Sequence, residues 1–140
     1  MLRQTLLHPQ LLGTLAALGH GSKVLVADGN YPFLTGANPT AVRVFLNVEP
    51  GVLTVDQVVG PLLSAVPIES AAVMVPPDDT PVEAHDGYRA MLGTAVPFEK
   101  LARTAFYDRS REPDVGLVVA TCDLRVYANL LLTIGVRTET

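Results

Sequence analysis

Two glycines flank His20 in the segment Gly19-His20-Gly21, and Asp28 follows a few residues later. A histidine placed in this way is open to a ligand, because neither neighbour has a side chain that could shield it. Imidazole groups exchange protons near neutral pH, so the two residues could support proton transfer to a small polar molecule. The alternative is a surface histidine at the end of a helix, where the helix dipole favours the imidazolium form.

Asp28 directly follows the apolar run Val24-Leu25-Val26-Ala27. Ligands of open α/β sheets gather at the carboxyl ends of the strands, so an aspartate at this point could bind sugar hydroxyl groups or orient a base. The alternative is an Asx turn, in which the carboxylate accepts a hydrogen bond from its own backbone. This segment is equally consistent with both interpretations.

Further polar groups come from two segments nearer the carboxyl end of the chain. Arg103 offers a rigid fork of donors for vicinal hydroxyl groups, although a solvated arginine paired with a carboxylate is the simpler interpretation of its segment. Tyr127 and Asn129 follow the apolar run 115–120 and supply a hydroxyl and an amide. Such groups suit a polyhydroxylated ligand. The alternative for Tyr127 is a ring that packs in the core.

Other chemistries find little support in the sequence. Cys122 could act as a nucleophile with His20 and Asp28 in a hydrolase, but a lone cysteine is more often buried and inert. The three histidines, His8, His20 and His85, lack the close spacing of metal ligands, so no metal is expected. Neither a GxGxxG nor a GxxxxGK[ST] motif is present, so no nucleotide cofactor is expected.

Composition narrows the class of protein and its partners. The 140 residues fit one domain, 1–140, and 49% of them are hydrophobic. Only 17% are charged, which predicts apolar surface left over for an oligomer. The net charge of −4 argues against a nucleic-acid partner. The longest apolar stretch, Leu130 to Val136, is too short for a membrane span, and the first residues do not resemble a signal peptide, so a cytoplasmic protein is expected.

Hydrophobic periodicity and turn residues predict alternating strands and helices. The predicted helices cover 9–18, 54–63, 81–91 and 104–111, the second opened by the capping box Thr54-Val55-Asp56-Gln57. The predicted strands cover 23–27, 42–46, 71–75, 98–101, 115–121 and 127–133. In the helix 81–91, Val82, Ala84, Tyr88 and Met91 are expected to face inward. This alternation predicts an α/β sheet covered on both faces.

The order and spacing of these segments resemble the ribose pyranase and fucose mutarotase family over nearly the whole chain. The matching segments are Leu18-Gly19-His20-Gly21, Ala27-Asp28-Gly29-Asn30-Tyr31-Pro32, Arg103-Thr104-Ala105-Phe106-Tyr107-Asp108-Arg109, Thr121-Cys122-Asp123, Tyr127-Ala128-Asn129 and Gly135-Val136. The resemblance implies a three-layer α/β/α fold with a central mixed, largely parallel sheet. It also implies a homo-oligomeric ring, decameric or built from pentamers, with active sites near the subunit contacts.

Residue roles follow from the same resemblance. His20 matches the position of the family's catalytic proton donor. The residues that match substrate-binding positions are Asp28, Tyr127, Ala128 and Asn129. Arg103 and the aromatic residues after it are similar to the fucose branch. The chain departs from that branch at Cys122-Asp123, where Gly-Glu is usual, and at Asn30, where histidine is frequent, so the exact sugar stays open.

The expected function is therefore acid–base opening and reclosure of the ring of a free monosaccharide, L-fucose or a similar sugar, without cofactor or metal. In this scheme His20 protonates the ring oxygen, while Asp28, Arg103, Tyr127 and Asn129 hold the sugar. A D-ribose pyranase is one alternative, and a non-catalytic sugar-binding protein that assists transport is another. A hydrolase that uses Cys122 and a purely structural oligomer complete the alternatives.

Overall fold

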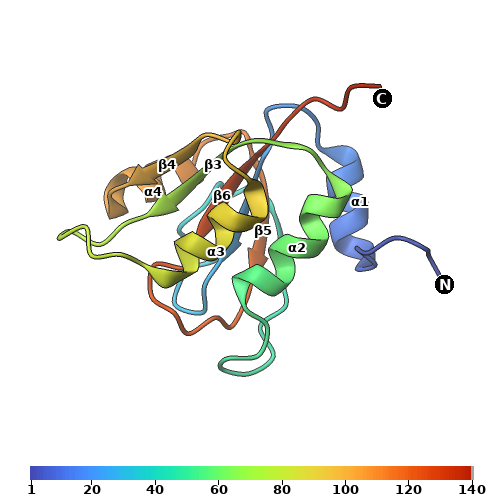
Figure 1. Cartoon of the computed structure of the whole chain (residues 1–140). Coiled ribbons are helices and arrows are strands. Elements are labelled where there is room, and N and C mark those ends of the chain that lie inside the picture. The colour runs from blue at the N-terminus through green and yellow to red at the C-terminus, as the bar shows by residue number, and fades with distance from the viewer. Residues whose placement is uncertain (140) are drawn as a thin grey trace.

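A six-stranded sheet forms the centre of the fold (Figure 1), and the computed structural model describes residues 1–139. The strands lie in the order β2-β5-β1-β6-β3-β4. Their bounds are β1 Lys23–Ala27, β2 Val42–Phe45, β3 Ile68–Met74, β4 Phe98–Leu101, β5 Val115–Ala120 and β6 Leu130–Ile134. The central strands β1, β5 and β6 are almost entirely buried, as their continuous apolar sequences predict.

Strand direction decides which residues lie together at one end of the strands of this sheet. β5 is parallel to both β1 and β2, and β3 is parallel to β4, whereas β6 is antiparallel to its neighbours β1 and β3. Five strands therefore run one way and β6 runs the other way. As a result, the residues just before β6 lie at the same end of the sheet as the carboxyl ends of β1, β3 and β4.

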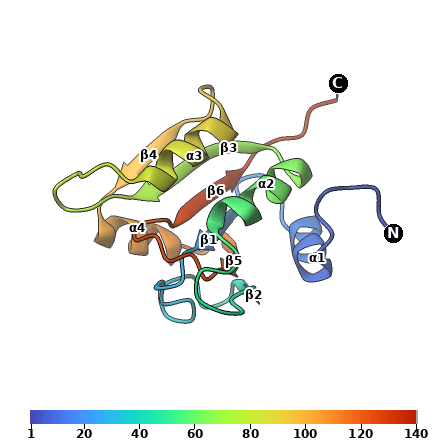
Figure 2. The same cartoon turned by 60° about the horizontal axis from the view of Figure 1, so that its bottom comes forward.

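Helices cover both faces of the sheet and give three layers. The helices are α1 Pro9–Ala17, α2 Val55–Ala65, α3 Glu83–Leu92 and α4 Arg103–Ser110. α1, α2 and α3 pack on one face, and α4 with the segment 31–41 packs on the other, so α3 and α4 lie on opposite sides of the sheet in Figure 2. Side chains of β1 alternate between the two cores, with Val24 and Val26 on the first face and Leu25 and Ala27 on the second.

The predicted elements and the α/β class are confirmed, with three local corrections. β3 begins at Ile68 rather than at residue 71. β6 begins at Leu130, so Tyr127 to Asn129 form a loop before the strand instead of its first residues. In α3, Met91 is exposed, because the buried stripe continues from Tyr88 to Leu92, one turn further along the helix.

The capping box at the start of α2 is formed as the sequence predicts. The Thr54 hydroxyl accepts a hydrogen bond from the Gln57 backbone N–H at 3.4 Å, and the Thr54 N–H donates to the Gln57 side chain at 2.9 Å. We expect Thr54→Ala to lower the free energy of unfolding by about 1 kcal/mol, measured by urea denaturation. Ser64→Ala is the matched control, because that exposed hydroxyl lies in the last turn of α2 and donates to the Pro61 carbonyl rather than accepting from a free N–H at the start of the helix; equal losses in the two variants would contradict a capping role.

Candidate functional site

A cavity of about 210 Å³ opens at the edge of the sheet where β1, β3 and β4 end and β6 begins. It is lined by Asp28, Asn30, Tyr31, Met74, Arg103, Tyr107, Val126, Tyr127 and Asn129. Its volume is below the roughly 300–1,000 Å³ of sites for drug-sized ligands, so it suits a molecule of monosaccharide size. The carboxyl edge of an open α/β sheet is the expected place for such a site.

Asp28 is the buried acid of this cavity and is held by the loop before β6. Its backbone N–H donates to Oδ1 of Asn129 at 2.8 Å, and its own Oδ1 accepts from the Asn30 N–H at 3.0 Å. Burial raises the pKa of Asp28 above its ordinary value, although the backbone N–H groups of Asn30 and Ala128 act in the opposite direction. Because the Asn129 amide oxygen is already engaged, Asn129 presents its NH2 group as a donor to a ligand.

An aromatic wall with one guanidinium group lines the same cavity. Arg103 begins α4, and its Cζ lies 5.7 Å from the centre of the Tyr107 ring one helical turn later. The Tyr107 ring stacks in turn on Tyr31 with 5.2 Å between centroids. The Tyr31 hydroxyl donates to the Gly36 carbonyl at 2.6 Å, and burial raises its pKa to about 12. Tyr31 is therefore a neutral wall residue, and the exposed Arg103 supplies guanidinium donors.

The loop that carries Tyr127 has a constrained backbone. Tyr127 has a φ of 61°, in the left-handed region that a tyrosine rarely adopts. Its carbonyl oxygen lies 2.8 Å from Nε2 of His85, and the next carbonyl, of Ala128, accepts from the Tyr88 hydroxyl at 2.6 Å. Ala128 itself is buried and contributes backbone groups, whereas Tyr127 turns its ring into the cavity wall.

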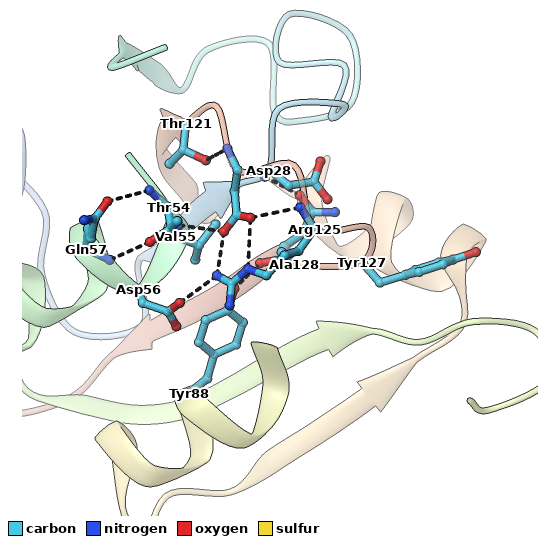
Figure 3. Close-up of polar contacts among 12 residues, drawn as sticks. Asp28, Thr54, Val55, Asp56, Gln57, Tyr88, Thr121, Arg125, Tyr127 and Ala128 are labelled. Atoms are coloured by element: carbon cyan, nitrogen blue, oxygen red, sulfur yellow. Dashed lines mark hydrogen bonds and ion pairs between the residues drawn. The ribbon is translucent and has the colours of Figure 1, made fainter. Parts of the chain in front are cut away.

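An ion-pair cluster supports the same loop from the side of α2 (Figure 3). Asp123 is buried and accepts hydrogen bonds from the Val55 N–H at 3.0 Å and from two nitrogens of Arg125 at 3.0 and 2.6 Å. Arg125 also reaches Asp56 at 2.6 Å. Burial alone would raise the pKa of Asp123, but the Arg125 and Val55 hydrogen bonds outweigh it and hold that pKa below its ordinary value.

His20 lies before the amino end of β1, so it is at the opposite end of the strands from this cavity. It precedes β1, whereas Asp28 follows β1, and the five residues of that strand span about 16 Å. Its Nε2 lies 2.9 Å from Oε2 of Glu69, and both side chains are exposed. Within one chain, therefore, Asp28 cannot act directly on His20, contrary to the simple expectation from their closeness in the sequence.

The structure thus brings together Asp28, Arg103, Tyr127 and Asn129, with the buried backbone of Ala128 beside them, and leaves His20 apart. Cys122 is not among the residues that line the cavity. Residues that the sequence analysis did not single out for the site include Met74, Tyr31, Tyr107 and Val126. Met74 and Tyr31 could have been found, because they sit at or just beyond the carboxyl ends of two predicted strands.

Within residues 1–139, no three His, Cys, Asp or Glu side chains are grouped so that they could hold a metal ion. In the same part of the chain, no helix has both the length and the apolar character that crossing a bilayer requires.

An α/β fold with a small polar cavity at the carboxyl edge of its sheet places the chain among small-ligand proteins of this architecture. Comparison with known proteins gives the family. Residues 1–137 match the RbsD / FucU transport protein family, and the chain belongs to it.

Named relatives and a solved structure support this match over nearly the whole chain. The D-ribose pyranase of Paracidovorax citrulli is 32% identical, over 97% of this chain and 98% of the relative. The human fucose mutarotase is also 32% identical, over 94% of this chain and 90% of the relative. The fucose mutarotase of Streptococcus pneumoniae, solved with L-fucose, superposes with a TM-score of 0.79 at 28% identity, over 94% of each chain.

Proposed function

We propose that this protein interconverts the ring forms of a free monosaccharide by acid–base ring opening. The observation that carries the proposal is the cavity itself, in which a buried carboxylate meets an amide donor, a tyrosine and a guanidinium group. These groups match the donors and acceptors of a polyhydroxylated ring. The names of the relatives, D-ribose pyranase and fucose mutarotase, support the same class of isomerase reaction.

The chemistry requires two proton movements. The anomeric hydroxyl gives its proton to Tyr127, Asp28 or a water molecule while the ring oxygen gains one, the ring opens to the aldehyde, and reclosure on the other face gives the other anomer. In this proposal Asp28, Arg103, Tyr127 and Asn129 hold the hydroxyl groups, with the Ala128 backbone beside Asp28. His20 donates the proton to the ring oxygen. A well-placed acid and base typically contribute 10²–10⁴-fold to the rate, which suffices for a reaction that already proceeds in water.

His20 can take this role only if a second copy of the chain presents it to the cavity. Its exposed imidazole, paired with the exposed Glu69, is available for such a contact. Exposed apolar side chains lie near the cavity as well, with Val126 on its wall 65% exposed and Leu124 63% exposed. We therefore propose a homo-oligomer in which each site is shared between two copies, and for its form we propose the decamer or pentamer-based ring that the family resemblance implies.

The substrate proposed is L-fucose or a similar sugar. The support is Arg103 together with the aromatic Tyr107 in the cavity wall, an arrangement that resembles the fucose branch. D-ribose is the alternative substrate. We also propose that the protein is cytoplasmic. A non-catalytic sugar-binding protein that assists transport would use the same cavity, and the family description as a transport protein favours keeping this second candidate.

Exchange spectroscopy by NMR on L-fucose, D-ribose and D-galactose tests the proposal directly. We expect the purified protein to speed exchange between the anomers or ring forms of at least one sugar well above the rate in buffer. The sugar with the highest rate identifies the substrate. Binding of a sugar without faster exchange of its ring forms would favour the transport-accessory function and reject the mutarotase.

A further inference from the structure

Helix α3 holds the backbone of the Tyr127 loop at two successive carbonyl groups. The imidazole of His85 lies 2.8 Å from the Tyr127 oxygen through Nε2, and the Tyr88 hydroxyl donates to the Ala128 oxygen at 2.6 Å. His85 and Tyr88 are three residues apart, so they project from one face of the helix. Both are buried, with His85 7% exposed and Tyr88 0% exposed.

The Tyr127 loop needs such support, because its conformation is unfavourable on its own. A tyrosine at a φ of 61° is strained, and strained residues persist only where their surroundings determine them. The Tyr127 ring lines the cavity with Asp28 and Asn129, while its carbonyl points the other way, to α3. The direction of the carbonyl and the direction of the ring are coupled through the same backbone.

We propose that His85 is a positioning residue that sets the Tyr127 ring in the sugar site through the hydrogen bond to the Tyr127 carbonyl. The inference rests on the proposed function. A carbonyl can only accept, so the imidazole must donate from Nε2, and a neutral ring then carries its proton there rather than on Nδ1. Tyr88 acts beside it on Ala128, the residue whose N–H faces Asp28.

The surroundings of His85 favour this neutral form. Burial lowers the pKa of His85 below its ordinary value, and Lys100 of β4 adds to the effect, whereas the hydrogen bond to the Tyr127 carbonyl and the charge of Asp86 act in the opposite direction without reversing it. The ring also borders a second hollow of about 490 Å³, whose charged groups are Asp79, Asp86, Arg89 and Lys100. On the side of the sugar site, His85 forms its hydrogen bond with the Tyr127 carbonyl.

Three variants separate the hydrogen bond from simple packing. His85→Leu keeps an apolar side chain in the space but removes the donor, and we expect the exchange rate at saturating sugar to fall about tenfold. His85→Gln keeps a donor at a similar reach, and we expect it to retain the rate to within about threefold. Leu92→Ala weakens the packing of α3 without touching the loop, and it is the control for a general loss of helix stability.

A spectroscopic measurement tests the positioning without any sugar. We expect the ring signals of Tyr127 in NMR spectra of tyrosine-labelled protein to shift in His85→Leu and to stay near their wild-type positions in His85→Gln and Leu92→Ala. A wild-type protein that exchanges no sugar would reject the proposed function but leave this measurement valid. Unshifted Tyr127 signals in His85→Leu, or equal losses of rate in the Leu and Gln variants, would overturn the role of His85.

Discussion

Two inactive variants of this protein are expected to restore activity when they assemble together. Alone, His20→Ala and Asp28→Asn should each slow sugar exchange by about 100-fold or more, because each removes one acid–base or binding group from every site. In oligomers formed from equal amounts of both chains, about a quarter of the sites should combine an intact His20 with an intact Asp28 from another copy. The expected result is therefore about a quarter of the wild-type rate.

If His20 takes part in catalysis, its separation from Asp28 within one chain requires that another copy supply it to the site. His20 and Asp28 stand at opposite edges of the sheet, with the whole of β1 between them. Asp28→Asn is a mild change, because an asparagine oxygen can still accept from the Asn30 N–H that Asp28 binds at 3.0 Å. A loss of activity in this variant would report the charge rather than a broken turn.

The measurement is NMR exchange on co-expressed chains, which assemble together from the start. The control is His20→Ala co-expressed with the double variant His20→Ala/Asp28→Asn, in which no copy offers His20 and no recovery is expected. Absence of recovery in the first mixture, with mixed oligomers verified by mass spectrometry, would show that no site is shared between copies. Full wild-type activity of His20→Ala alone would remove this histidine from the mechanism.

Asp123→Ala is expected to lower the free energy of unfolding by about 3 kcal/mol, the lower end of the range for breaking a buried ion pair. Asp123 is 1% exposed and accepts from Val55 at the start of α2 and from Arg125. Its loss leaves a buried N–H without its acceptor. The Arg125 side chain is 36% exposed, so its guanidinium group can turn towards solvent, which keeps the cost from being larger.

Asp56→Ala is the matched control, because Asp56 binds the same guanidinium group from the surface side. The Asp56 side chain is 34% exposed, and a solvent-accessible ion pair contributes less than about 1 kcal/mol, so we expect a smaller loss in this variant than in Asp123→Ala. Urea denaturation at neutral pH measures both. Similar losses from the two aspartates would contradict the view that burial makes Asp123 the important partner.

The pH dependence of stability follows from the direction of the pKa shift of Asp123. Its pKa is lower in the folded protein than its ordinary value of 3.8, so the unfolded chain binds the proton more readily. The stabilisation is present above about pH 4 and is lost as the pH falls through the folded pKa. In the Asp123→Ala variant this part of the acid sensitivity should be missing.

The site could be predicted from the sequence where its residues are placed by their own strands. Asp28 follows a buried strand and is found at its carboxyl end, in the cavity. Arg103 directly precedes the predicted helix 104–111, and it lies in the cavity at the start of α4. The bond from His85 to Tyr127 and the pair of Arg125 with Asp56 could not be predicted, because these partners lie 42 and 69 residues apart in the chain and no local pattern links them.

By itself the sequence determined the elements and the groups that end them. Apolar periodicity places the strands, the Thr54 capping box starts α2, and Asp28 directly follows β1. These features can be read from the sequence because each depends on neighbours within a few residues. Only the tertiary structure decided that β6 runs antiparallel, which carries Asn129 to the edge where Asp28 lies. It also decided that His20 stands at the other edge. Strand order and direction are set by pairings between distant segments, and no local pattern encodes them.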